Sequence, residues 1–239
     1  MSDIGGDFIF RGMAEALGWL TLTIVLYIAA RRVQSAAKGN PLANSVLLAA
    51  VPIMMILTVA DVPVSQYQEG GIVLLWILGP ATVALAVPFF INFIHVRAAW
   101  KPMAVALLVG SVVAVISSVL IGHLLGASIE TVRSLAPKTV TTPIAMGISE
   151  EIGGIPELTA AFVIFTGIIG AVAASAVFKL VGVSDARARG FGMGVAAGGI
   201  GTARAFQESL IAGTFSGVGM TLNGIITAIL LPLLWLAFS

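Results

Sequence analysis

Long apolar runs dominate the pattern of residues along the chain. A helix needs about 20 apolar residues to cross a hydrocarbon core of about 30 Å. Six runs reach or approach that length, and each predicts a transmembrane helix: residues 13–30, 45–60, 71–94, 102–125, 158–178 and 210–238. This pattern predicts an all-α polytopic membrane protein.

Two segments interrupt the pattern because they are too polar, too glycine-rich or too short to be ordinary spans. They are residues 136–156, APKTVTTPIAMGISEEIGGIP, and residues 190–208, GFGMGVAAGGIGTARAFQE. Irregular backbone at membrane depth occurs only where it is buried in protein or lines a cavity, since every N–H and C=O must be paired. Transporters bind their cargo at broken helices of this kind. We therefore predict a transporter-like fold with two broken or re-entrant segments.

The positions of Lys and Arg in the short loops predict the orientation, because basic residues are retained on the cytoplasmic side. They gather around 31–38, 97–101 and 179–189, whereas the loops between these carry Asp and Glu. We expect these three loops in the cytoplasm. This orientation favours a re-entrant path for 136–156.

A weak internal repeat is visible at an offset of 57 residues. Residues 79–83 read GPATV and residues 136–140 read APKTV, and Gly110 aligns with Gly167 at the same offset. A parallel repeat would make the segment after residue 136 a full span. Eight transmembrane helices are therefore the alternative to six spans with two re-entrant segments.

Composition supports a membrane protein and excludes several other classes. Hydrophobic residues make up 59% of the 239 residues and charged residues only 10%, against about 25% charged in an ordinary soluble domain. Cysteine is absent and the two histidines have no carboxylate cluster nearby, so we expect neither a metal nor another cofactor. The net charge of +1 offers no basic face for nucleic acid. We expect one integral membrane domain over residues 1–239, with the lipid bilayer around it.

The first broken segment has the composition of a small anion site. It combines a lysine, several hydroxyls and a proline that frees backbone groups, all of which can serve a carboxylate. The candidate residues are Lys138, Thr139, Thr141, Thr142, Pro143, Ser149, Gly153 and Gly154. The alternative is a solvated outer loop with ordinary turn residues.

The second broken segment offers glycines that allow close approach of the backbone and an arginine that can clamp a carboxylate. Its candidate residues are Gly199, Gly201, Thr202 and Arg204. The alternatives are helix packing through Gly194 with Gly198 and Gly213 with Gly217, and a salt bridge from Arg204 to Glu208. Asn223, alone in a long apolar run, is a further candidate for the cavity wall. No catalytic set is evident at membrane depth, so we do not expect an enzyme.

Four stretches resemble the LrgB/CidB family. SLAPKTVTTPIAMGISEEIGGIPELTA at 134–160 closely resembles its signature stretch, and this motif is specific. GPATVALAVP at 79–88, GIGTARA at 199–205 and LNGIITAILLPLL at 222–234 resemble further blocks. The resemblance covers nearly the whole chain, and the candidate residues of both broken segments fall on the family's polar and glycine-rich motifs.

The resemblance implies a multi-pass protein of the bacterial inner membrane. It implies an antiholin-like modulator of murein hydrolase activity and lysis, often encoded beside a smaller holin-like partner. It also implies kinship with the carboxyl-terminal half of the plastidic glycolate/glycerate translocator. Family members usually show Ser-His before the glycine-rich motif, where this chain has Ala197-Gly198. Proton coupling would then require another group, for which the candidates are Glu150, Glu151 and Glu208, or would be absent.

The leading hypothesis is a carrier for small monocarboxylates such as glycolate, glycerate, lactate or pyruvate, working by alternating access within a homodimer. Lys138 and Arg204 would neutralise the carboxylate, with the two broken segments meeting near the midplane. The alternative is an antiholin-like regulator that acts with a holin-like membrane partner on murein hydrolases.

Overall fold

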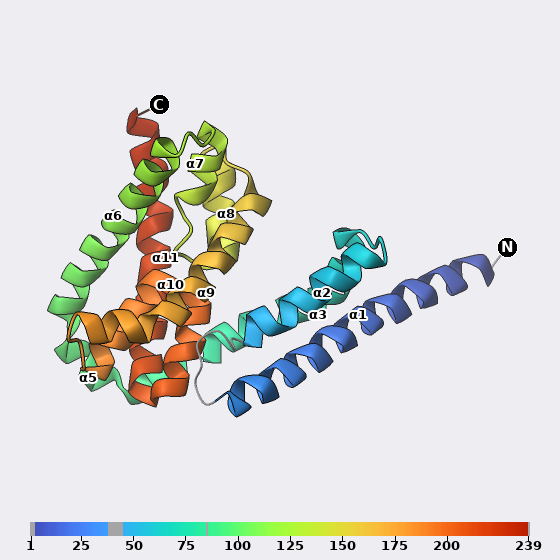
Figure 1. Cartoon of the computed structure of the whole chain (residues 1–239), viewed down its shortest axis with the longest axis horizontal. Helices are drawn as coiled ribbons and strands as arrows, with labels where there is room; N and C mark the ends of the chain where they lie inside the picture. The colour runs from blue at the N-terminus through green and yellow to red at the C-terminus, as the bar shows by residue number, and fades with distance from the viewer. Residues whose placement is uncertain (1–2, 38–44, 85, 239) are drawn as a thin grey trace. The chain divides into compact units, whose positions relative to one another are not determined.

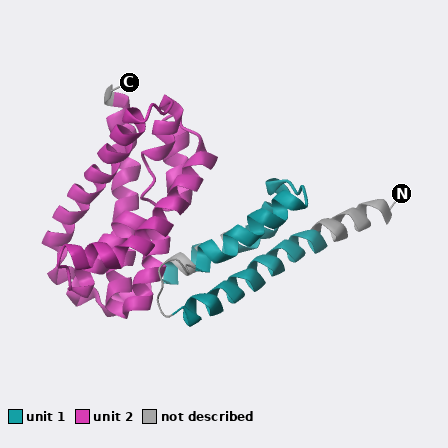
Figure 2. Cartoon of the chain, viewed as in Figure 1, with its two compact units in different colours: residues 1–84 teal, residues 85–239 magenta. Residues whose placement is uncertain are grey.

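The computed structural model of the chain describes residues 3–37, 45–84 and 86–238, which form helices joined by short turns (Figure 1). No strand occurs within these ranges. Within them, four helices are long and apolar enough to cross a membrane: Met13–Ala36, Trp100–Leu124, Pro156–Leu180 and Leu210–Leu236. The predicted all-α polytopic membrane fold is confirmed. The chain divides into two compact units, residues 1–84 and 85–239 (Figure 2).

The first unit consists of three helices. They are α1 (Asp3–Ala36), α2 (Ser45–Val59) and α3 (Val64–Ala84), and α1 packs against both of the others. Trp19 of α1 meets Tyr67 of α3 edge to face at 6.0 Å, and the hydroxyl of Tyr67 lies 3.0 Å from Thr23 Oγ1. The first two predicted spans are therefore helical.

The prediction of one continuous span over 71–94 is wrong. Helix α3 begins earlier than predicted, and the helical residues described after Ala84 form α4 (Ala86–Ile91) and α5 (Phe93–Ala98). Asn92 interrupts the helix with φ −100° and ψ 13°. Its side chain donates to the carbonyl of Pro88 at 2.9 Å and to Thr214 Oγ1 at 3.2 Å. An Asn side chain that bonds backbone in this way competes with the helical pattern.

Three long helices and two hairpins make up the rest of the second unit. The long helices are α6 (Trp100–Leu124), α9 (Pro156–Leu180) and α11 (Leu210–Phe238). The first hairpin, residues 129–155, contains α7 (Ile129–Leu135), an irregular tip at 136–141 and α8 (Thr142–Glu151). The second hairpin is α10 (Ala186–Glu208). Figure 1 shows α7 and α8 near the carboxyl end of α11 and α10 toward its other end.

Each hairpin returns to the end from which it starts. In the first, the backbone N–H of Ile155 donates to Ser134 Oγ at 2.7 Å, which joins its base to α7. In the second, Gly198 reverses the helix with φ 52° and ψ −135°, a left-handed conformation that glycine adopts without strain. Arg189 near the start of α10 then reaches Glu208 at its end, 3.0 Å away. Both predicted segments are therefore broken, and both follow the re-entrant path rather than the additional spans of the eight-helix alternative.

The two hairpins enter from opposite ends of the second unit. Helix α9 begins beside the base of the first hairpin and ends with Phe178 beneath Arg189 of the second, 5.3 Å from the ring centre. Helix α11 begins beside the second hairpin and ends with Trp235 beneath Arg133 of the first, at 5.4 Å. The long helices thus connect the two bases, and the hairpin tips point toward each other.

Glycine spacing lets α10 lie directly on α11, as the small-residue pattern predicts. A Cβ added to Gly190 or Gly194 would collide with the carbonyl oxygens of Ala212 and Ser216 of α11. Gly217, by contrast, has open space around its Cβ position. The packing prediction therefore holds for Gly194, but Gly217 takes no part in this contact.

Substituting Gly194→Ala should destabilise the protein by about 1–3 kcal/mol, because the added methyl group forces two rigid backbones apart. The measurement is the unfolding temperature of the purified protein in detergent. Gly217→Ala is the matched control, and it should leave that temperature nearly unchanged. Equal effects of the two substitutions would contradict the described packing of α10 on α11.

Candidate functional site

The tips of the two hairpins meet at one buried amide. Asn223 of α11 is completely buried, and its Nδ2 donates to the carbonyl oxygens of Thr139 and Val195, both at 3.2 Å. Its Oδ1 accepts from Ser111 Oγ of α6 at 2.6 Å. The side chain therefore joins both hairpins and two long helices. It binds carbonyls at the irregular tip of one hairpin and beside the break of the other, where the regular helical pattern is interrupted.

Lys138 lies at the tip of the first hairpin. Its Nζ donates to Ser118 Oγ of α6 at 2.6 Å. Neither of the salt bridges formed by the described residues involves it. A lysine ammonium has three N–H donors, and here one of them is used on a side chain. The half-buried ammonium therefore has no carboxylate partner among the described residues.

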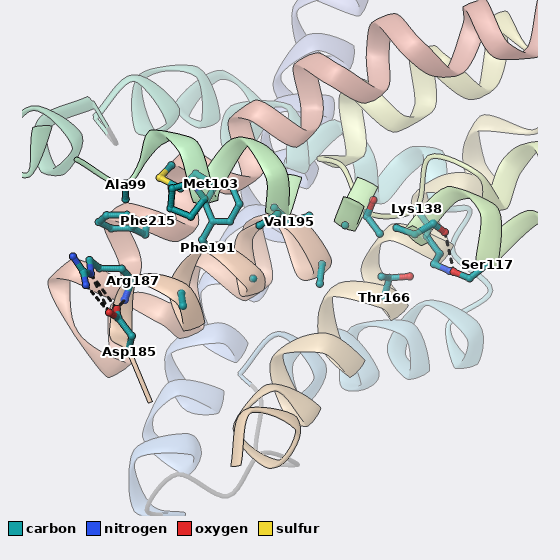
Figure 3. Close-up of a pocket in the computed structure, with 18 of the residues that line it drawn as sticks. Ala99, Met103, Ser117, Lys138, Thr166, Asp185, Arg187, Phe191, Val195 and Phe215 are labelled. Atoms are coloured by element: carbon teal, nitrogen blue, oxygen red, sulfur yellow. Dashed lines mark hydrogen bonds and ion pairs between the residues drawn. The ribbon is translucent and has the colours of Figure 1, made fainter. Parts of the chain in front are cut away.

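A cavity of about 780 Å³ extends from this lysine to the start of α10, at Asp185 and Arg187 (Figure 3). Its walls come largely from α6, from the first arm of α10, which is the part before Gly198, and from Phe215 of α11. At the inner end four polar side chains converge: Ser117, Lys138, Thr139 and Thr166. Most of the wall between this end and the mouth is apolar, with Met103, Phe191, Val195 and Phe215 among its residues.

An ion pair lies at the mouth of the cavity. Arg187 Nη2 is 2.6 Å from Asp185 Oδ2, and both side chains are exposed. The hydrogen bonds from the Arg187 side chain hold the pKa of Asp185 well below its ordinary value. This acid is therefore ionised and already neutralised by its partner. Among the described residues no group of three His, Asp or Glu side chains is placed to hold a metal ion.

The structure divides the candidates of the first segment into cavity residues and framework residues. Lys138 and Thr139 line the cavity. Ser149 is buried and accepts from Thr159 Oγ1 of α9 at 2.7 Å. Thr141 caps α8, and Thr142 and Pro143 begin it. Gly153 and Gly154 lie against Arg133 and Ser134 at the base of the hairpin, and Glu150 and Glu151 are exposed there.

The candidates of the second segment lie apart from Lys138. Gly199, Gly201 and Thr202 belong to the second arm of α10, where Thr202 Oγ1 lies 3.0 Å from Ser216 Oγ. Arg204 donates to Gln207 at 3.3 Å and is not among the residues that line the cavity. Glu208 pairs with Arg189 rather than with Arg204. The structure therefore brings Lys138, Thr139 and Asn223 together without Arg204.

Several site residues were not among the sequence candidates. Ser111, Ser117, Ser118 and Thr166 all lie on long apolar helices, where single hydroxyls have little effect on hydropathy. The sequence feature that could have identified them is their polar side chain, since polar groups inside a membrane helix tend to face the protein interior or a cavity. The position of Arg187 at the cavity mouth depends on the tertiary fold.

Glu208→Gln should destabilise the protein by about 1–3 kcal/mol, between the values for exposed and fully buried ion pairs, because Arg189 would lose a half-buried partner. Thermal unfolding in detergent measures this, with Asp185→Asn of the exposed pair as a control that should change little. If Glu208 instead served proton coupling, the variant would stay as stable as the parent and lose only its response to a pH gradient.

Comparison with known proteins gives consistent relatives. A model of the LrgB-like family matches residues 23–237, across both units. "Uncharacterized protein YwbG" of Bacillus subtilis is 37% identical over 216 residues, which are 90% of this chain and 95% of the relative. "Holin-like protein CidB" of Staphylococcus epidermidis is 31% identical over 224 residues, 94% of this chain and 97% of the relative. No solved structure matches the chain.

Proposed function

This chain belongs to the LrgB-like family, and for this member we propose transport of small organic anions by alternating access. The proposed cargo is a monocarboxylate such as glycolate, glycerate, lactate or pyruvate. The protein would act in a bacterial cytoplasmic membrane as a homodimer.

The observation that carries this proposal is the unpaired Lys138 at the inner end of a cavity. An ionised group in a low-dielectric site is unfavourable unless an opposite charge or hydrogen bonds compensate it. Neither salt bridge of the described residues reaches Lys138. Because the cavity leads directly to this cation, a diffusing anion can supply the missing charge.

The lining favours a short anion with a single carboxylate. Lys138 provides the one cation at the inner end, and the hydroxyls of Ser117, Thr139 and Thr166 can bind the remaining oxygens. Arg187 at the mouth is engaged with Asp185. A dicarboxylate would therefore lack a free second cation, and a longer cargo would extend along the apolar wall. Arg204 does not line this cavity, so it is left out of the proposed anion site.

A second candidate function follows from the names of relatives. "Holin-like protein CidB" at 31% identity connects the chain with a holin-like process. The second candidate is therefore an antiholin-like regulator that would act with a holin-like membrane partner on murein hydrolases. This role requires a protein interface and no saturable anion site. The pure protein would then either let solutes through without selectivity or conduct none.

The deciding experiment is uptake of labelled glycolate, lactate and pyruvate into proteoliposomes that contain the pure protein, with a pH gradient applied or withheld. We expect saturable uptake that Lys138→Met lowers about tenfold or more, because a hydrogen bond to a charged group contributes about 1.5–3 kcal/mol. Lys101→Met is the matched control, since Lys101 is an exposed lysine that lies over Trp100.

Folded protein that takes up none of these acids under any gradient would contradict the carrier. Release of a large trapped dye from the same vesicles would then indicate the holin-like role.

A further inference from the structure

The offset of 57 residues extends through the architecture of the second unit. Helix α7 begins at residue 129 and α10 at residue 186, while α8 ends at residue 151 and α10 at residue 208. Both pairs of positions differ by 57. Each hairpin is followed by a long helix, α9 after the first and α11 after the second. Hairpin and long helix together therefore occur twice in succession.

A hydroxyl contact also recurs, with its partners on the long helices 57 residues apart and its partners on the hairpins, Ser149 and Thr202, 53 apart. Thr159 of α9 bonds Ser149 in the second arm of the first hairpin, at 2.7 Å. Ser216 of α11, 57 residues after Thr159, lies 3.0 Å from Thr202 in the second arm of the second hairpin. The same kind of bond thus fixes each hairpin to the long helix that follows it.

A second pair of contacts runs between the two copies. Phe178 and Trp235 are 57 residues apart, and each ring lies beneath an arginine. Arg133 of the first hairpin covers Trp235 of the second copy, and Arg189 of the second hairpin covers Phe178 of the first copy. Such a reciprocal exchange is what an approximate two-fold axis produces. Because the hairpins also enter from opposite ends, the two copies are related as an inverted repeat.

The symmetry fails at one pair of equivalent positions. Asn223 of α11 and Thr166 of α9 are 57 residues apart. Asn223 is buried and binds the tips of both hairpins, whereas Thr166 lines the open cavity and its hydroxyl makes no hydrogen bond to the described residues. The asymmetry follows from chemistry, since an amide has two N–H donors for two carbonyls and a hydroxyl has only one donor.

We propose that Asn223 and Thr166 are the equivalent gate positions of an inverted repeat. Asn223 closes the route toward the first hairpin's end in the conformation described. Release of its bonds opens that end, while closure around Thr166, whose hydroxyl supplies one donor, seals the other. This inference rests on the proposed carrier function and gives it a second conformation. Val195 is the equivalent of Lys138 and lies at the tip of the second hairpin, where Asn223 binds its carbonyl. Lys138 lies at the tip of the first hairpin, so it stays at the junction of the two tips in both conformations.

The absence of cysteine makes the gate directly testable. Ala196→Cys places one thiol on an exposed position of the cavity wall. A membrane-impermeant maleimide is added to sealed vesicles of either orientation, and labelling from the two faces is compared. We expect the parent to be labelled mainly from the face that carries Asp185 and Arg187.

Two gate variants should shift this ratio in the same direction, toward labelling from the first hairpin's face. Asn223→Thr removes one of the two bridging bonds and should raise labelling from the first hairpin's face about fivefold, the effect of one neutral hydrogen bond. Thr166→Asn should lower labelling from the other face by a similar factor. Thr221→Asn, at an exposed position of α11, is the matched control.

The result that overturns the gate is an unchanged labelling ratio in the gate variants. If Asn223→Thr does not fold, Thr166→Asn decides alone, since it alters only a cavity wall. The readout requires no cargo, so the gate and the proposed function can fail separately. The expected shifts without carboxylate uptake would support the gate and contradict the cargo, whereas uptake without shifts would contradict the gate.

Discussion

The fold of the second unit depends on one requirement, which is that no backbone carbonyl at membrane depth be left without a donor. The chain breaks twice where helical bonding would have met this requirement, at 136–141 and at Gly198. Asn223 supplies donors to a carbonyl beside each break. One amide therefore permits two irregular segments in the same place, and this is the place where a lysine meets a cavity.

The remaining contacts of the hairpins support this junction from a distance. Their bases are held by Arg133 against Trp235 and by Arg189 against Glu208 and Phe178. The glycines of α10 bring its first arm directly onto α11. Because both bases are fixed and both tips end on Asn223, a change in the bonding of that amide is the smallest change that would release a tip.

Hydropathy predicted the long helices well because burial in lipid imposes a length and a composition that tertiary packing does not alter. The polar segments were recognised for the same reason, since their backbone is unfavourable in lipid. The break at Asn92 was missed because it depends partly on Thr214, which is 122 residues away. Likewise, the composition near the glycine-rich motif favoured Arg204 over Arg187, and only the course of α10 places Arg187 at the cavity.

The arrangement of charges would make the proposed anion site both attractive and reversible. The two acids at the base of the second hairpin are already paired, Asp185 with Arg187 and Glu208 with Arg189. Lys138 is instead bound to the neutral hydroxyl of Ser118. In the proposed carrier a carboxylate would bind the Lys138 donors that Ser118 leaves unused, and no salt bridge would have to break. After release of the anion the bond to Ser118 would remain, so the lysine would keep an acceptor.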